Sequence, residues 1–408
     1  MLTSSHHRNR RGPTIAAYAF AHFGKSLWWN GSELFLAFYL TEHLQLEPLI
    51  AGAAIAVGLM LGAAFDLLVG ARLSRFASAP RLGQLQFVGA GIATLALVLL
   101  GSVVTIVHDA RLPIIIGANI VYRLAYTLYD LPQNALLSLA AWTPDQRRWA
   151  AAARTAAGAI ALLLMASLVT MDRPSSSGGI HAAFAGFASV IALLSAGRLW
   201  WESRRTPDDG DAVFHADETA LLWRWPLVVM ALVCLTLPAF SKFAPYLISY
   251  LPGSGVQMPL VAIGIATVAS QPLWIGLVRR MGEVGGGIIA ALVMVLAAFS
   301  MEWLWLASLL VGIASGGFGT VIWSGFAISV AGRNSLAAAP AFARLTATAK
   351  IALAAAAIGM GAILSTVDYR EGGVGLIPFM RGLMLVGGVL TAAYLSLVAL
   401  PKREKRAG

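Results

Sequence analysis

Six basic and three acidic side chains lie inside apolar stretches of this 408-residue chain. They are Lys25, Arg123, Arg154, Lys242, Arg344 and Lys350 on the basic side, and Glu33, Asp66 and Asp130 on the acidic side. If the stretches cross a bilayer, each charge costs roughly 2.5–3.5 kcal/mol at its centre, so such residues face a cavity or the bundle interior and mark a substrate or ion path. The surplus of positive charge predicts an anionic cargo.

The composition indicates a membrane protein. Apolar residues make up 58% of the chain and charged residues 12%, whereas soluble proteins carry roughly 25% charged residues. We predict an all-α membrane protein with twelve transmembrane helices, because apolar runs long enough to cross a bilayer recur along the chain. The predicted spans are 14–41, 49–71, 82–107, 112–141, 148–171, 180–201, 221–251, 256–278, 284–301, 303–331, 337–366 and 376–400.

The basic residues gather on one predicted side of the membrane. If the N-terminus and alternate loops share a side, nineteen of the 29 Lys and Arg residues lie there and three lie on the other side. The positive-inside rule then places both termini in the cytoplasm. The net charge of +10 follows from this topology, so it indicates no nucleic-acid partner.

A polar segment, Glu202–Thr219, divides the chain almost equally and predicts a linker between two halves. The predicted parts are an N-terminal six-helix bundle over 1–201, a cytoplasmic linker over 202–220 and a C-terminal six-helix bundle with a basic tail over 221–408. A weak internal repeat supports the division, since Asp66–Arg75 resembles Pro272–Arg280 at the second-to-third helix junction of each half.

Two six-helix halves related by a repeat resemble the major facilitator superfamily, whose central cavity opens alternately to the two sides of the membrane. Three stretches resemble one family within it, the glycoside-pentoside-hexuronide:cation symporters of the melibiose permease type. They are Phe23-Gly-Lys-Ser-Leu-Trp-Trp-Asn30, Tyr129-Asp-Leu-Pro-Gln-Asn-Ala-Leu-Leu137 and Phe342-Ala-Arg-Leu-Thr-Ala-Thr-Ala-Lys350. The resemblance implies a secondary transporter of glycosides or uronides driven by a cation.

In that family the cation site is a cluster of acids on the first, second and fourth helices, and this sequence keeps part of it. Asp66 stands where the first acid of the second helix is expected, whereas Gly70 and Ser26 replace two other acids. Sodium prefers several hard oxygen ligands, so this loss favours H⁺ over Na⁺ as the coupling ion. A lone carboxylate can carry a proton, because desolvation disfavours its charged form. The coupling candidates are Asp66, the leading carrier, with Glu33 and Ser26.

The resemblance also places Asp130 and Arg154 where the family binds sugar hydroxyls, with Lys25 nearby. A carboxylate accepts hydrogen bonds from hydroxyls and a guanidinium donates to them. The family's aromatic residue after Asp-Ile-Pro is replaced by Gln133-Asn134, which removes a surface for stacking on a sugar ring. The predicted substrate contacts are Lys25, Trp29, Arg123, Asp130, Asn134, Arg154 and Lys350.

Several of these charges also have an interpretation as ion pairs. Arg123 and Asp130 are about two helical turns apart on one face and could neutralise each other. Glu33 either replaces a missing acid or pairs with Lys25 or Arg123. Lys242 either contacts an anion at a proline-broken helix or bridges two helices.

The sequence contains no Walker, HExxH or GxSxG motif, so it indicates neither an ATP-driven pump nor a membrane hydrolase. Cys234 is the single cysteine, which excludes an intrachain disulfide and a thiolate metal cluster. We expect no enzyme activity, no cofactor and no metal, and a monomer in a bacterial-type inner membrane. The predicted function is proton-coupled symport of a small organic anion, sugar acid or glycoside.

Two alternatives remain open. One is a transporter of a larger amphipathic anion, such as a siderophore, a peptide-linked sugar or a lysophospholipid, because the aromatic residue that stacks on sugars is absent. The other is a non-transporting membrane sensor on a transporter fold. Charged side chains inside a membrane protein cost free energy and usually have a function, which argues against the non-transporting sensor.

Overall fold

The chain folds as a bundle of helices. The computed structural model describes residues 13–43, 45–75, 78–102, 111–140, 142–171, 179–205, 224–250, 258–331 and 337–400, and every regular element among them is helical. The first elements are α1 (Ile15–Phe38), the π-helix η1 (Tyr39–His43), α2 (Pro48–Leu73), α3 (Ala79–Ser102), α4 (Arg111–Leu139), α5 (Pro144–Met171) and α6 (Gly179–Ser203). The later elements are α7 (Arg224–Thr236), α8 (Pro238–Tyr250), α9 (Met258–Ala269), α10 (Gln271–Phe299), α11 (Leu304–Ala331), α12 (Ala338–Thr366), the 3-10 turn η5 (Val374–Leu376) and α13 (Ile377–Ala399).

Helices overlap all twelve predicted spans. By length and composition, seven helical segments among the described residues could cross a membrane. Helices are the expected elements there, because a bilayer offers no water to the backbone and each N–H and C=O must be satisfied within its own segment. The predicted linker 202–220 is described as far as Arg205, and the rest of it lies outside the described residues.

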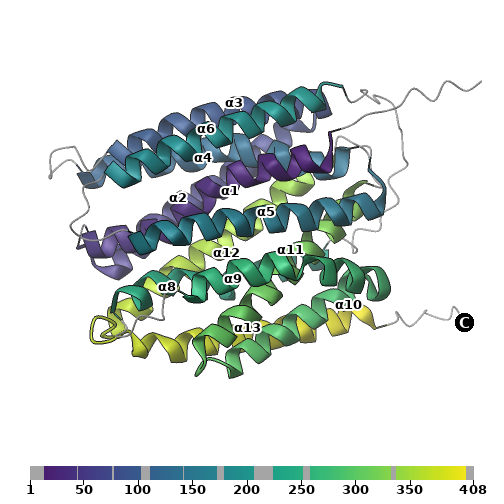
Figure 1. The fold of residues 1–408 in the computed structure, drawn as a ribbon. Helices are drawn as coiled ribbons and strands as arrows, with labels where there is room; N and C mark the ends of the chain where they lie inside the picture. Colours follow the sequence, from purple (N-terminus) through teal and green to yellow (C-terminus); the bar gives the residue numbers. More distant parts are fainter. Residues whose placement is uncertain are drawn as a thin grey trace, which may run out of the picture.

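The helices form two groups that meet along α2 and α12. Figure 1 shows α1 to α6 in the upper part of the view and α8, α9, α10, α11 and α13 in the lower part, with α12 between them against α2. Glycines bring the α2 and α12 backbones together. A Cβ on Gly361 would lie 2.5 Å from the Pro48 carbonyl oxygen, and one on Gly52 would lie 2.5 Å from the Ala357 carbonyl oxygen. Small residues permit such close approach of helices in lipid.

Two predicted spans each consist of two helices. Range 221–251 contains α7 and α8, which are separated at Leu237 because Pro238 lacks an N–H and its ring clashes with the preceding turn. Range 256–278 contains α9 and the first part of α10, with the break at Ser270. Within α10 the backbone turns at Gly282, whose φ of 72° is a conformation that glycine adopts readily.

The bundle has two ends that matter for the site. In Figure 1 the start of α1 and the end of α13 lie on the right, and we call this the terminal end. The π-helix η1 and the connection between α12 and η5 lie on the left, which we call the opposite end.

Candidate functional site

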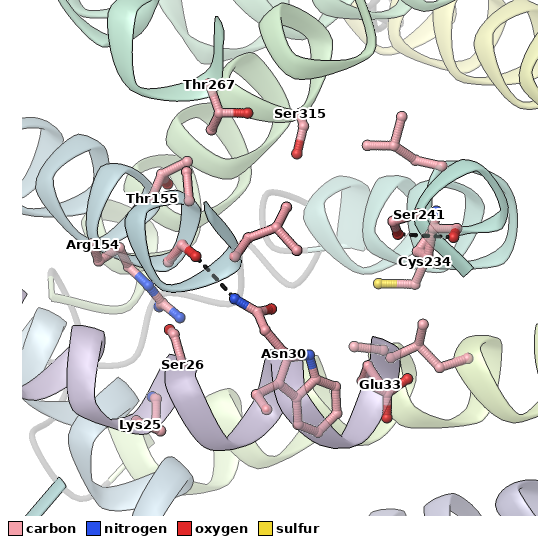
Figure 2. Close-up of a pocket in the computed structure, with 18 of the residues that line it drawn as sticks. Lys25, Ser26, Asn30, Glu33, Arg154, Thr155, Cys234, Ser241, Thr267 and Ser315 are labelled. Atoms are coloured by element: carbon pink, nitrogen blue, oxygen red, sulfur yellow. Dashed lines mark hydrogen bonds between the residues drawn. The ribbon is translucent and has the colours of Figure 1, made fainter. Parts of the chain in front are cut away.

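A cavity of about 410 Å³ lies inside the bundle, lined by helices of both groups. Figure 2 shows part of its wall, with α1 carrying Lys25, Ser26, Asn30 and Glu33 along one side. The predicted residues that line it are Lys25, Ser26, Trp29, Glu33, Asp130, Asn134, Arg154 and Lys350. Asp66 and Arg123 are buried and are not part of the lining, but each is paired with a residue that is, Lys350 and Glu33 respectively.

Asp66 lies in a buried contact between α2, α4 and α12. Lys350 Nζ is 2.6 Å from Asp66 Oδ1, and Thr127 Oγ1 donates to the same oxygen at 2.6 Å. The second carboxylate oxygen, Oδ2, is buried without a hydrogen-bond partner in the described structure. The prediction of a lone carboxylate is therefore wrong, since the close approach of α2 and α12 brings Lys350 onto Asp66.

Lys25 joins α1 to α4 at the cavity wall. Its Nζ is 2.6 Å from Asp130 Oδ1 and donates to Asn134 Oδ1 at 3.1 Å. Asp130 thus pairs with Lys25, and the alternative pair with Arg123 does not form. Lys25, Asp130 and Asn134, three of the predicted substrate contacts, are therefore in one hydrogen-bonded group, and Arg154 is not part of it.

Glu33 forms ion pairs with two basic side chains, one at each of its carboxylate oxygens. Arg123 Nη2 is 2.7 Å from Oε1, and Lys242 Nζ is 2.5 Å from Oε2. Of the alternatives predicted for Glu33, the structure shows the pair with Arg123, and Lys242 bridges two helices, which is one of its two predicted interpretations. Arg123 is also held against Trp29 and Tyr122, with its guanidinium carbon 5.2 Å and 5.7 Å from the two ring centroids.

Arg154 is the cavity cation whose charge is least compensated. Its guanidinium carbon lies 3.4 Å from the ring centroid of Trp323, so α5 contacts α11 through a cation–π interaction. None of the ion pairs between described residues includes Arg154, and its Nη1 has no hydrogen-bond partner among them. A buried guanidinium in this state is a strong donor for an incoming acid or hydroxyl group.

Sequence reasoning missed the neutral polar wall and the apolar wall of the cavity. Asn30 donates from Nδ2 to the Gly158 carbonyl at 2.9 Å, and Figure 2 shows Thr155, Ser241, Thr267 and Ser315 around the same space. Apolar lining residues include Met230, Leu237, Ile263 and Val311. Helical spacing could have found Asn30, because positions 26, 30 and 33 share one face of α1. The hydroxyl residues carry no such signal, since Ser and Thr are common throughout membrane helices.

A family model described as MFS/sugar transport protein matches residues 17–401. The chain belongs to this family. A comparison with curated proteins found no match.

Solved structures of transporters share the fold. The proton:xylose symporter XylE bound to 6-bromo-6-deoxy-D-glucose is 15% identical, with a TM-score of 0.66 over 94% of this chain and 95% of that chain. The human organic anion transporter MFSD10 is 14% identical, with a TM-score of 0.60 over 93% and 98%. A bacterial homologue of the iron transporter ferroportin in an outward-facing state is 13% identical, with a TM-score of 0.64 over 94% and 99%. The chain is thus a multi-pass membrane transporter for a small molecule and not an enzyme.

At the terminal end of this MFS transporter, α5 is joined to α10 by two ion pairs. Arg148 Nε donates to Glu283 Oε1 at 2.9 Å, and Arg279 Nε donates to Asp145 Oδ1 at 2.8 Å. The second pair is exposed, and the first is half-buried beside it. These pairs link the two helix groups between the cavity and the terminal end.

The opposite end is joined by what we call the Glu42 cluster, consisting of Glu42, Tyr250, Tyr369 and Arg370. The Glu42 carboxylate accepts hydrogen bonds from Tyr250, from Tyr369 at 2.7 Å and from Arg370 at 3.2 Å. Partial burial raises the pKa of Glu42, but these three donors outweigh it and hold the pKa below its ordinary value. Glu42 follows α1, whereas its partners belong to α8 and to the connection after α12, so the cluster also joins the two helix groups.

Proposed function

We propose that this MFS transporter is a proton-coupled symporter of a small organic anion or sugar acid. The charge of the cavity carries the proposal. Five cations stand in or directly behind its wall against three carboxylates: Lys25, Arg123, Arg154, Lys242 and Lys350 against Glu33, Asp66 and Asp130. Such a surplus favours a negatively charged ligand, because electrostatic attraction is strong where water is excluded.

The proposed architecture is twelve spans in two halves, 1–201 and 221–408, with both termini in the cytoplasm of a bacterial-type inner membrane. The one-sided distribution of Lys and Arg and the two helix groups of Figure 1 support it. The resemblance to glycoside-pentoside-hexuronide:cation symporters supports a sugar-related substrate. Among the structures with this fold, one is titled an organic anion transporter and another a proton:xylose symporter, so both the cargo and the coupling ion have parallels.

Alternating access requires the two halves to separate at one end and then at the other. Two buried ion pairs cross between the halves, Asp66 with Lys350 and Glu33 with Lys242. Breaking a buried pair leaves an uncompensated charge, which is strongly unfavourable unless another charge or a proton takes its place. An anion bound to a lysine, or a proton bound to a carboxylate, meets this need.

Asp66 is the proposed proton carrier. A proton on this carboxyl group would neutralise it and release Lys350, which lines the cavity and could then bind the substrate anion. The buried oxygen Oδ2 is available to hold the proton, since it has no hydrogen-bond partner among the described residues. Proton and anion would therefore bind together, as symport requires.

The test is uptake by proteoliposomes with an inward proton gradient, using glucuronate, galacturonate and gluconate with neutral methyl glycosides as the comparison. We expect gradient-driven accumulation of an acid without sodium. In Asp66→Asn, accumulation should be lost while exchange of external for internal substrate continues. Accumulation of a neutral glycoside with no acid transported, or an unchanged pH response in Asp66→Asn, would overturn the proposal.

A second candidate is a larger amphipathic anion, because the second helix group contributes an apolar wall that includes Met230, Ile263 and Val311. Cys234 provides the discriminating measurement, since it is the single cysteine and lines the cavity. Slower reaction of its thiol with N-ethylmaleimide in the presence of lysophosphatidylglycerol, and unchanged reaction with uronates, would favour the amphipathic ligand. Protection by uronates alone would favour the sugar acid. Cys234→Ala gives the labelling background.

A further inference from the structure

We infer that the cavity contains two separate cationic subsites and takes a dianion, with one acid group at each subsite and an apolar segment between them. The inference rests on the proposed anion transport and adds the number and spacing of the negative charges. The first subsite, the Arg154 subsite, consists of Arg154 with Lys25 and Lys350. The second, the Lys242 subsite, consists of Lys242 with Arg123.

Each subsite keeps positive charge after its own ion pairs are counted. At the Arg154 subsite, Lys25 is paired with Asp130 and Lys350 with Asp66, so Arg154 stands without a carboxylate partner among the described residues. At the Lys242 subsite, one carboxylate, Glu33, serves two cations. Each subsite therefore has a net charge of +1.

The two subsites lie at different levels of the cavity. Lys25 and Glu33 are eight residues apart on α1, which corresponds to roughly 12 Å along the helix axis. In Figure 2, Arg154 lies beside Ser26 and Lys25 on one side of the view and Glu33 on the other, with Asn30 between them. One small acid group cannot contact both subsites at once.

Lys242 is the group of the second subsite that a ligand can reach. It lines the cavity, whereas Arg123 does not and is held between Trp29 and Tyr122. An ammonium has three N–H donors, and Glu33 is the one hydrogen-bond partner of Lys242 among the described residues. The remaining donors can bind a second acid group without displacing Glu33.

The cavity that contains both subsites also has an apolar part of its lining, which fits an apolar segment of the ligand. Met230 and Leu237 line the cavity from α7 and the break before α8, while Ile263 and Val311 line it from α9 and α11. A polar linker would lose its water there without gaining a partner from these four side chains. An extended dicarboxylate with a hydrocarbon middle satisfies both the charges and the wall.

The experiment uses titration calorimetry on the detergent-purified full chain with the dicarboxylates succinate, adipate, suberate, sebacate and dodecanedioate, each beside its monomethyl ester. We expect affinity to pass through a maximum at an intermediate length. At that length the diacid should bind roughly tenfold more tightly than its monoester, because one more hydrogen bond to a charged group contributes about that much. This comparison needs no mutation, so it does not depend on the folding of a variant.

The variant Lys242→Gln tests whether Lys242 binds the second acid group. Glu33 keeps Arg123 as its partner in this variant, so the carboxylate is not left alone. We expect the diacid to lose its advantage over the monoester, while monoester binding stays unchanged. Arg381→Gln removes a cation outside the cavity, at a partly exposed pair with Glu302, and should leave both affinities unchanged.

Three results would overturn the inference. Equal binding of diacid and monoester at every length in the unmutated protein would exclude a second subsite while leaving anion transport intact. A diacid preference that survives Lys242→Gln would exclude Lys242 as the second subsite. Binding of a neutral methyl glycoside with no binding of any acid would overturn the proposed function itself.

Discussion

Single residues in this transporter show how buried charges are tolerated in a membrane bundle. Lys350, Asp66 and Thr127 are all buried, and each of the three side chains is hydrogen-bonded to the other two. Desolvating two charges offsets much of their attraction, so such a pair contributes little net stability, but removal of one partner is strongly destabilising. The ion pair of Asp66 and Lys350 thus contributes little to the stability of the fold, but protonation of Asp66 would change the local free energy strongly.

The Asp66 and Lys350 pair predicts non-additive effects on stability. Asp66→Asn alone leaves the buried ammonium without its carboxylate and should cost about 3–5 kcal/mol, whereas Asp66→Asn combined with Lys350→Gln should cost less than the single change. Thermal unfolding of the purified variants measures this. The exposed pair of Asp145 and Arg279 is the control, and its removal should change the unfolding temperature little, because solvent screens exposed ion pairs. Additive losses at Asp66 and Lys350 would contradict an energetic coupling between them.

Arg154 and Trp323 predict a graded loss of anion binding. Arg154→Ala removes the uncompensated charge and should abolish measurable binding of an acid at the Arg154 subsite. Trp323→Leu keeps the charge and removes the ring beneath it, and because a desolvated cation–π contact contributes about 2 kcal/mol to holding the guanidinium, the affinity should fall by roughly tenfold to thirtyfold. Titration with sebacate monomethyl ester measures both. An effect of Trp323→Leu as large as that of Arg154→Ala would mean that the ring itself contacts the ligand.

Among the helices, the sequence predicted the spans better than their interruptions. Apolar runs identify the membrane-crossing segments because the thickness of the bilayer sets how many consecutive apolar residues a span needs. The break at Leu237 precedes Pro238 and the break at Ser270 precedes Pro272, and the predicted spans did not use these prolines because they followed apolar composition alone. The partners of the buried charges were harder to predict. A pair of Glu33 with Lys25 or Arg123 was one of the predicted alternatives, but the partner of Asp66 lies on α12, and a single sequence does not show how α2 and α12 are rotated against each other.

The contact between α2 and α12 predicts a position-specific effect of adding one methyl group. In Gly361→Ala the new Cβ meets the Pro48 backbone at 2.5 Å, so the helices must separate, which costs on the order of 1–3 kcal/mol. Gly359→Ala is the matched control on the same helix, because nothing lies within 4 Å of its Cβ. Alanine favours a helix over glycine, so this control should be neutral or stabilising. Equal melting temperatures for the two variants would show that the helices are not in contact at Gly361.

At the scale of the whole molecule, polar contacts connect the two helix groups on both sides of the cavity. The terminal end uses Arg148 with Glu283 and Arg279 with Asp145, and the opposite end uses the Glu42 cluster. A transporter that works by alternating access must open each of these connections in turn. Charged contacts suit this purpose, because exposed ion pairs contribute little net free energy and water can replace them.

The Glu42 cluster also allows the proposed coupling proton to be assigned by its pH response. Because the pKa of Glu42 is held below its ordinary value, the ionised cluster is fully formed above the ordinary glutamic acid value and is lost as pH falls through the lowered pKa. We expect Glu42→Gln to speed backbone hydrogen exchange in Asp368–Gly373 at neutral pH, with the ratio of variant to wild-type rates falling towards one in strong acid. Using the ratio at matched pH removes the intrinsic pH dependence of exchange.

Across neutral and mildly acidic pH this ratio should stay constant, because Glu42 remains ionised in the closed protein. Any change of transport with pH in that range must then come from another group, and Asp66→Asn should remove it while Glu42→Gln should not. If Glu42→Gln removed the pH dependence instead, the proton would act on the connection at the opposite end. The buried pair of Asp66 and Lys350 would then have a structural role in holding α2 against α12.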